Sequence, residues 1–175
     1  MSRQPRQRPS AEAVLDQAAL RSVFGSFATG VTVLTAGTRN PHGMTANSFT
    51  SVSLYPPLVL VCVRKDAIMH EAILWHDAFA VSVLSSAQEP AARYFADRTR
   101  PRGLGEFDPI EHEPGPRTGA PLLSGALAWI ECAVAEVYEG GDHSIFLGSV
   151  LEAGRGTPRE ALLFVQGAFH SFNPG

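Results

Sequence analysis

The stretch of residues 42–63, HGMTANSFTSVSLYPPLVLVCV, contains the side chains best suited to hold a flat ligand. Small and hydroxyl residues fill its first half, and no charged side chain occurs between Thr45 and Val63. Such small side chains allow a planar heteroaromatic ring to approach the backbone, where N–H groups and hydroxyls can donate to ring carbonyls and nitrogens. The same composition also fits a β-hairpin in which Thr and Ser only satisfy strand propensity. The residues alone leave both interpretations open.

The histidines, glycines and cysteines argue against several other kinds of site. No two of the six histidines have the i, i+4 spacing of a helical metal site, so no metal is expected. The chain contains no G-x-G-x-x-G sequence, which excludes a Rossmann domain for a dinucleotide. Cys62 and Cys132 lie in apolar runs, where an inert buried thiol is more typical than a disulfide.

Length and composition predict one globular domain. The chain has 175 residues, of which 45% are apolar and 18% charged, so it can bury a sizeable core. Residues 1–12 are basic and Pro-rich and predict a disordered arm before a single domain at 13–175. The net charge of −3 gives no reason to expect nucleic acid or a membrane as partner. No apolar run is long enough to span a bilayer, and a cytoplasmic protein is expected.

The apolar periodicity predicts many short strands and few helices. Asp66 is expected to cap one helix, and Ser86 with Glu89 to form a capping box for another. Residues 97–119 are rich in Pro, Gly and charge and predict a surface loop that could act as a lid. The expected helices are 16–30, 66–75 and 86–96. The expected strands are 31–36, 43–53, 58–63 (buried on both faces), 78–84, 126–137, 144–152 and 162–172, a set typical of a closed antiparallel barrel.

Three segments, in this order, give the chain a family resemblance: FATGVTVLT at 27–35, GMTANSFTSVSLYPP at 43–57 and GDHSIFLGSV at 141–150. From about Leu20 to Phe172 the chain resembles the short-chain flavin reductases, the reductase components of two-component flavin-dependent monooxygenases. The resemblance implies a mainly β fold, the FMN-binding split β-barrel, assembled as a homodimer. It also implies an NAD(P)H:flavin oxidoreductase that binds FAD or FMN, takes hydride from NADH or NADPH, and supplies reduced flavin to a separate monooxygenase.

The same resemblance assigns flavin-binding positions. The ring would lie on Gly43, Met44, Thr45, Ala46, Asn47 and Ser48, and the ribityl phosphate on Cys62, Val63 and Arg64, with Lys65 beside them. Many relatives carry hydroxyls in the next helical turn, where this chain has Ala67, Ile68 and Met69, so main-chain amides would have to bind the phosphate. Relatives often have Arg-Phe where this chain has Tyr94 and Phe95; Arg93 could take over that role, or Tyr94 could stack on an adenine.

For the nicotinamide, the resemblance indicates His143 in the Gly-Asp-His turn and the strand around Leu163 and Phe164. Hydride transfer to a flavin requires stacking and distance and no proton relay, so no catalytic acid or base is expected. The turn could instead be structural, with Asp142 satisfying backbone groups. Two other functions remain open: a flavin storage or sensor protein of the same fold, and a pyridoxal-phosphate oxidase-like enzyme, which would need a denser basic cluster than Arg64, Lys65 and Arg93.

Overall fold

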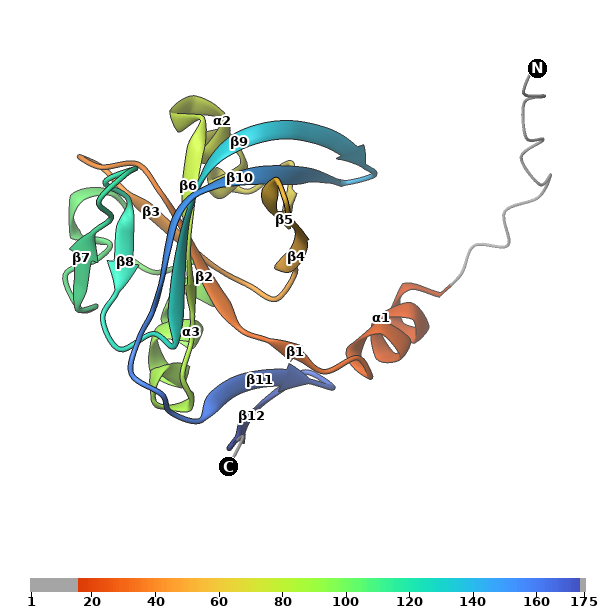
Figure 1. Ribbon diagram of the computed structural model, residues 1–175. Coiled ribbons are helices and arrows are strands. Elements are labelled where there is room, and N and C mark those ends of the chain that lie inside the picture. The colour runs from red at the N-terminus through yellow and green to blue at the C-terminus, as the bar shows by residue number, and fades with distance from the viewer. Residues whose placement is uncertain (1–15, 174–175) are drawn as a thin grey trace, which may run out of the picture.

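The computed structural model describes residues 16–173 as three antiparallel sheets with short helices around them (Figure 1). The helices are α1 (Gln17–Gly25), α2 (Ile68–His76) and α3 (Glu89–Ala96), with 3-10 turns η1 (Ser86–Gln88) and η2 (Gly103–Gly105). The strands are β1 (Thr29–Gly30), β2 (Thr32–Ala36), β3 (His42–Ala46), β4 (Thr50–Leu54), β5 (Pro57–Arg64), β6 (Ala78–Val83), β7 (His112–Pro114), β8 (Pro121–Leu123), β9 (Ala128–Gly140), β10 (His143–Arg155), β11 (Ala161–Val165) and β12 (Ala168–Phe172). The predicted mainly β class is confirmed, whereas the predicted arm at 1–12 lies outside the described residues.

The largest sheet has seven strands in the order β3-β2-β6-β9-β10-β5-β4. Its two edge strands, β3 and β4, are consecutive in the chain and separated only by residues 47–49. Because so few residues reach little more than 10 Å, the sheet must curl until its edges approach each other. The edges are not hydrogen-bonded to each other, so the predicted closed barrel is wrong and the split barrel implied by the resemblance is confirmed.

This topology also corrects two predicted strands. The single strand predicted at 43–53 is wrong, because the chain leaves one edge of the sheet at Ala46 and joins the opposite edge at Thr50. The strand predicted at 58–63 exists as β5, but only one of its faces is fully buried, through Val59, Val61 and Val63. The opposite face, with Leu58, Leu60 and Cys62, is half-buried.

The longest strands, β9 and β10, form a hairpin that bends across the barrel (Figure 1). Their pairing shifts register between Leu147 and Gly148, as expected where a bulge increases the twist of a sheet. A Cβ on Gly148 would lie 2.7 Å from the Phe79 ring, so only glycine allows the strand to pass this side chain. The hairpin can therefore wrap closely around the core.

Helix α2 packs on β2, β3 and β6 and places Met69 and Ile73 in the main core. The predicted cap of this helix is wrong: Ala67 is the N-cap residue, without a side-chain hydrogen bond, and Asp66 pairs with Arg64 at 2.6 Å. The predicted capping box is displaced by one residue, to Ser85 and Gln88 at the start of η1.

The segment predicted as a surface loop, 97–119, is anchored to the barrel. It contains η2 and β7, which pairs with β8. Glu131 on β9, fully buried, accepts a hydrogen bond from Thr118 N at 2.7 Å and holds the second half of the segment. Phe107 packs into the second core cluster with Phe95. The segment is therefore a fixed wall of the molecule.

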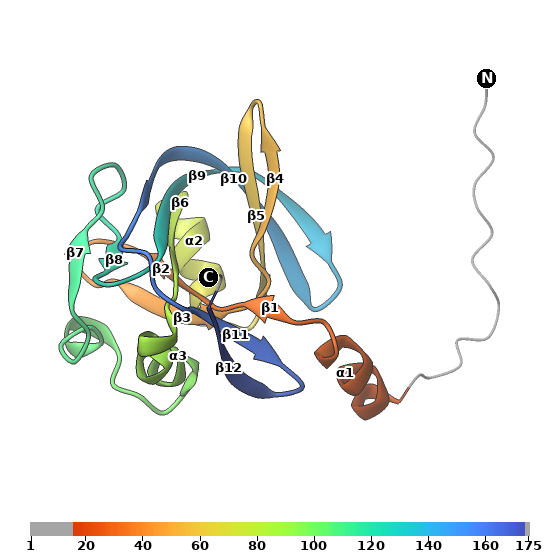
Figure 2. The same cartoon turned by 60° about the horizontal axis from the view of Figure 1, so that its bottom comes forward.

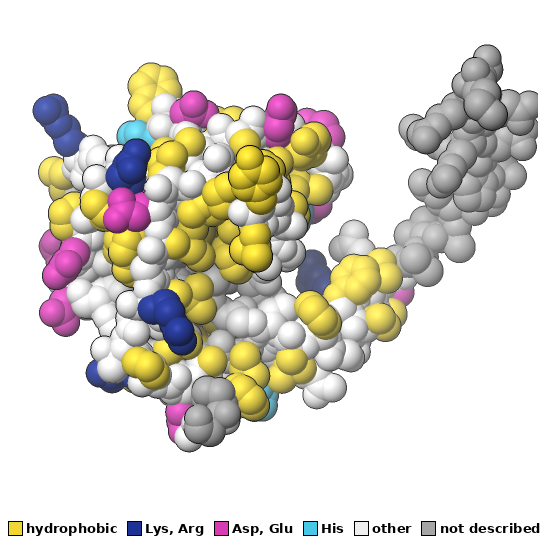
Figure 3. All heavy atoms as spheres, viewed as in Figure 1, with side chains coloured by type: hydrophobic (Ala, Val, Ile, Leu, Met, Phe, Trp, Pro, Cys, Tyr) yellow, Lys and Arg dark blue, Asp and Glu magenta, His cyan; other side chains and the backbone are white. Residues whose placement is uncertain are grey.

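Apolar side chains remain exposed on the face that carries α1, β4 and β5 (Figure 3). Helix α1 stands away from the barrel, and none of its side chains is buried by the described residues (Figure 1). Phe24 and Phe27 are 69% and 77% exposed, and Tyr55, at the tip of the projecting β4–β5 hairpin, is 97% exposed (Figure 2). Within residues 16–173, none of the helices has the length and hydropathy needed to cross a bilayer.

The predicted inert thiols fit their surroundings. Burial raises the pKa of Cys62, and burial together with the nearby Glu131 carboxylate raises the pKa of Cys132 to about 12. Both cysteines are free. Thiolate chemistry at neutral pH is therefore disfavoured at both positions.

Candidate functional site

One side chain fastens the segment that crosses between the two sheet edges to β5. Ser48 Oγ donates to the carbonyl of Cys62 at 2.9 Å and accepts from the amide of the same residue at 3.1 Å. These two bonds fasten the crossing segment to β5. Asn47, next to it, is exposed, and its side chain has no hydrogen bond among the described residues. The Asn47 amide is thus available to a ligand, whereas the Ser48 hydroxyl is engaged by the fold.

An apolar cavity of about 200 Å³ opens beside this crossing segment. Thr45, Ala46 and Asn47 line one side of it. Phe164 and Phe169, whose ring centroids lie 5.3 Å apart, line another. The apolar walls and the polar edge at Asn47 match the needs of a flat heteroaromatic ring.

A second cavity, of about 330 Å³, continues from the first along β3, and Thr45 and Ala96 line both. Its lining contains three arginines, Arg98, Arg100 and Arg102. It also includes the start of α2, where the N-cap lacks a side-chain bond and leaves first-turn amides to solvent or ligand. Cations and a helix N-terminus together favour an anion such as a phosphate.

The cations that line this cavity are not the predicted ones. Arg64 is paired with Asp66, and Lys65 with Glu139, and neither lines the described cavities. Arg98, in contrast, has no ion pair within residues 16–173. The sequence analysis missed the segment RTRPR at 98–102 because it lies in an irregular stretch; its only signal is the recurrence of Arg at every second residue.

A buried ion pair fixes the strand under both cavities. Glu106, 1% exposed, accepts hydrogen bonds from Arg100 Nη2 and from the amide of Gly43, both at 2.9 Å. Arg100 Nη2 also donates to the carbonyl of Gly43. Both main-chain groups of Gly43 are thereby held by this pair. A Cβ at Gly43 would lie 2.3 Å from the Phe95 ring, so glycine is required for β3 to pack against α3.

His42 completes this cluster, with Nδ1 at 2.9 Å from a Glu106 oxygen. A carboxylate only accepts, so Nδ1 carries the proton in this bond. Burial alone would raise the pKa of Glu106, but hydrogen bonds from His42 and Gly43 hold it below its usual range. Glu106 therefore stays ionised and balances the charge of Arg100.

The other predicted flavin-binding residues divide into two groups. Met44 lines the basic cavity, Thr45 and Ala46 the apolar one, and Phe95 borders the basic cavity from the core side. The hydroxyl of Thr45 donates to the carbonyl of Ala92 at 2.6 Å and so holds α3 in place.

The second group has side chains that point elsewhere. Val63 and Met69 are buried in the main core, so only their main chain is available to a ligand. Tyr94 donates its hydroxyl to the carbonyl of Glu106 at 2.7 Å. Arg93 pairs with Glu89 and lies over the Phe169 ring. Ile68, in contrast, belongs with the first group, because it is 42% exposed and lines the basic cavity.

The predicted nicotinamide residues do not come together in one cavity. Phe164 lines the apolar cavity, and Leu163 is its neighbour on β11. His143 lies opposite Arg64 at the start of β10 and lines none of the described cavities. Its Nδ1 is 2.8 Å from Oδ1 of Asp142, and this hydrogen bond lowers the pKa of Asp142.

The Glu106 cluster generates a stability prediction. Replacing Glu106→Gln leaves Arg100 without its counter-charge and should lower the free energy of unfolding at pH 7 by about 3 kcal/mol. Because the folded pKa of Glu106 is depressed, its contribution is complete above its ordinary pKa of about 4.3 and is lost as pH falls through the lower folded value. Denaturant unfolding should therefore show a steeper loss of stability at acid pH in the wild type than in the variant.

Glu139→Gln is the matched control, because the Glu139 side chain is 84% exposed in its pair with Lys65 and such pairs contribute little. Equal stability of Glu106→Gln and wild type at pH 7 would contradict the role given to the cluster.

Comparisons with known proteins identify the family of this chain. Residues 24–173 match the family described as flavin reductase like domain. A Streptomyces globisporus protein named NADH-dependent FAD reductase is 56% identical over 95% of this chain and 92% of its own length. HsaB of Mycobacterium tuberculosis, the reductase subunit of a flavin-dependent monooxygenase, is 36% identical over 93% of this chain and 86% of its own.

A solved structure gives the same answer for the fold. The crystal structure of BorF, the flavin reductase component of a bacterial two-component tryptophan halogenase, superposes with a TM-score of 0.87 at 54% identity. The alignment covers 90% of this chain and 98% of BorF. The resemblance found in the sequence is confirmed, and the chain belongs to the flavin reductase family.

Proposed function

We propose that the protein transfers hydride from NADH to FAD or FMN in the groove along β3 and releases the reduced flavin to a separate flavin-dependent monooxygenase. One observation carries this proposal: an apolar cavity with a polar edge adjoins an arginine-rich cavity. A flavin has the same division, with a flat ring at one end and a phosphate at the other. NADH and FAD are the reductant and flavin named for the Streptomyces relative, and a partner oxygenase is named for HsaB.

The residues present fit a flavin. Thr45, Ala46 and Asn47 would border the ring, and Arg98, Arg102 and the start of α2 would bind the phosphate. When bound, the flavin supplies the hydride acceptor. The protein orients both partners and excludes water from the apolar cavity, which is sufficient for hydride transfer.

The nicotinamide of NADH is placed at the apolar cavity. Phe164 and Phe169, which pack edge to face at an interplanar angle of 61°, provide an apolar wall beside which a second ring could lie. His143, held by Asp142, would orient the carboxamide or a phosphate from the strand end next to Arg64. No acid or base is assigned to the reaction.

We also propose a homodimer, on the ground of the exposed apolar face. An isolated helix as short as α1 is not stable in water, yet none of its side chains is buried by the described residues. A second copy would cover Phe24, Phe27 and the β4–β5 hairpin and remove this apolar area from water. A cytoplasmic location, where NADH and free flavin are both available, remains a prediction.

Asn47 and Ser48 should separate binding from folding. Asn47→Leu removes an exposed amide and should weaken flavin binding about tenfold with an unchanged melting temperature, because the lost hydrogen bond is made only to the ligand. Ser48→Ala should weaken flavin binding and also lower the melting temperature, since it releases the crossing segment from Cys62. Flavin fluorescence titration and a melting curve measure the two effects. Unchanged flavin affinity in both variants would contradict the placement of the flavin ring on Asn47 and Ser48.

His143→Ala should raise KM for NADH or lower kcat/KM, with flavin affinity nearly intact. A contact equal in ground and transition states changes KM alone, whereas a positioning contact also lowers kcat. The measurement is NADH oxidation at saturating flavin, followed by absorbance. If the wild type does not oxidise NADH with either flavin, the protein is a flavin storage or sensor protein and not a reductase. Wild-type kinetics in the folded variant would remove His143 from the nicotinamide site.

The proposed homodimer is tested by measuring the molecular mass of the protein in solution. Light scattering at micromolar concentration should give twice the chain mass of 18.7 kDa. Phe24→Ser combined with Phe27→Ser should shift the protein toward monomer, because both rings would leave the shared surface. Leu104→Ser, an 85% exposed leucine on η2 away from α1, is the control. A wild-type monomer contradicts the proposal.

A further inference from the structure

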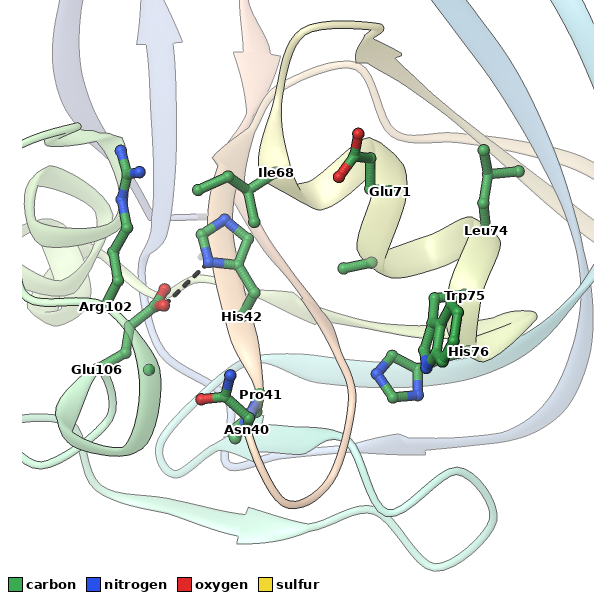
Figure 4. Close-up of a pocket in the computed structure, with 12 residues that line it drawn as sticks. Asn40, Pro41, His42, Ile68, Glu71, Leu74, Trp75, His76, Arg102 and Glu106 are labelled. Atoms are coloured by element: carbon green, nitrogen blue, oxygen red, sulfur yellow. Dashed lines mark hydrogen bonds and ion pairs between the residues drawn. The ribbon is translucent and has the colours of Figure 1, made fainter.

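The polar side chains that lie deepest in the basic cavity, and in a third cavity of about 620 Å³ beside it, are paired within the protein. Arg100, in the basic cavity, bonds to Glu106 and to the carbonyl of Gly43. Glu106 lines the third cavity, where His42 Nδ1 bonds to its carboxylate (Figure 4). A ligand is therefore not needed to satisfy these buried groups.

Thr29 is different. Its hydroxyl oxygen is the single buried side-chain oxygen or nitrogen that lacks a hydrogen bond within residues 16–173. Folding normally pairs such groups, because a buried hydroxyl without a partner lowers stability. A partner that arrives with a ligand would explain why the chain has a hydroxyl at this position.

The strand register places Thr29 in a row of side chains beside the apolar cavity. Thr29 lies opposite Phe164, and Phe164 opposite Phe169, across the three-stranded sheet β1-β11-β12. Directly opposed residues of an antiparallel pair point to the same face, with Cβ atoms about 5 Å apart. Phe164 and Phe169 line the cavity, as does Val31, two residues after Thr29 and on the same side of the chain.

Thr29 itself stands just behind this lining. The apolar cavity of about 200 Å³ is smaller than typical ligand sites of about 300–1,000 Å³. A fused ring system would therefore extend past the lining residues, and Thr29 is adjacent to two of them, Val31 and Phe164.

We propose that the Thr29 hydroxyl binds and orients an amide group on the edge of the ring held in the apolar cavity. The proposal rests on the proposed function, because it takes that cavity as a ring site. Amide carbonyl and N–H groups occur on the flavin ring and on the nicotinamide carboxamide, and a hydroxyl can donate to the first or accept from the second. Apolar walls leave a flat ring free to rotate in its own plane, whereas a hydrogen bond at its edge fixes its orientation for hydride transfer.

Thr29→Val replaces the hydroxyl by a methyl group of similar size. The variant should raise the melting temperature by about 3 °C, because the unpartnered buried group is removed. The same variant should weaken ligand binding about tenfold, because the bond made to the ligand is lost. Thr29→Ser keeps the hydroxyl and should keep the wild-type affinity.

Thr35→Val is the matched control, because it makes the same chemical change at a hydroxyl that donates to the carbonyl of Pro121 at 2.7 Å. This control should lower the melting temperature and leave ligand binding unchanged. The two threonines are thus expected to shift the melting temperature in opposite directions.

Two binding measurements identify the ring that Thr29 contacts. Fluorescence titration gives the Kd for FMN and FAD, and calorimetry without flavin gives the Kd for NADH. A loss of flavin affinity in Thr29→Val assigns the bond to the flavin ring, and a loss of NADH affinity alone assigns it to the carboxamide.

Unchanged affinity for the flavins and for NADH in Thr29→Val would overturn the proposal. A lowered melting temperature would overturn it too, because the hydroxyl would then have a partner in the free protein. Failure of the proposed function is distinguishable, since it appears as no NADH oxidation by the wild type, whereas the melting temperature and both Kd values are measured without turnover.

Discussion

The connection of β3 to β4 by residues 47–49 constrains the rest of the structure, because it joins the two opposite edges of a seven-stranded sheet. So short a link is possible only if the sheet curls into a nearly complete barrel. The hydrogen bonds of Ser48 with Cys62 fasten this link to β5, and the two edge strands are not paired with each other. The apolar cavity opens beside this link, at Thr45, Ala46 and Asn47.

Charge is distributed unequally along the groove, and burial explains the difference. Arg100 is buried and balanced by Glu106, so it stabilises β3 and adds little net charge to the cavity. Arg98 and Arg102 are exposed and form no ion pair within the described part of the chain. One arginine of the segment 98–102 thus holds β3 under the basic cavity, and the other two contribute positive charge to its lining, which also contains Asp66.

The sequence predicted the fold class and the segment at 43–48 that lines the apolar and basic cavities. The alternating strands, the helix after residue 66 and the small residues at 43–48 are local patterns, and periodicity or resemblance within a few residues is enough to find them. Thr45, Ala46 and Asn47 line the apolar cavity, where their small side chains leave room, and the larger Met44 lines the basic one. The role of Lys65 was not predictable, since its partner Glu139 lies on a strand far away in the sequence. Arg64 pairs with Asp66 only two residues away, an acid that the sequence analysis had assigned to the cap of the next helix.

The amino-acid sequence by itself thus determined which strands form, which segment is small enough to face a flat ring, and which family the chain belongs to. The tertiary structure alone decided that one predicted strand is two edge strands, that an irregular segment supplies the cations, and that Glu106 and Arg100 are partners. The physical reason is how far apart in the sequence the interacting residues lie. Strand periodicity and side-chain size are read within a few residues of the sequence, whereas sheet topology and cavities depend on segments far apart in the chain that folding brings together.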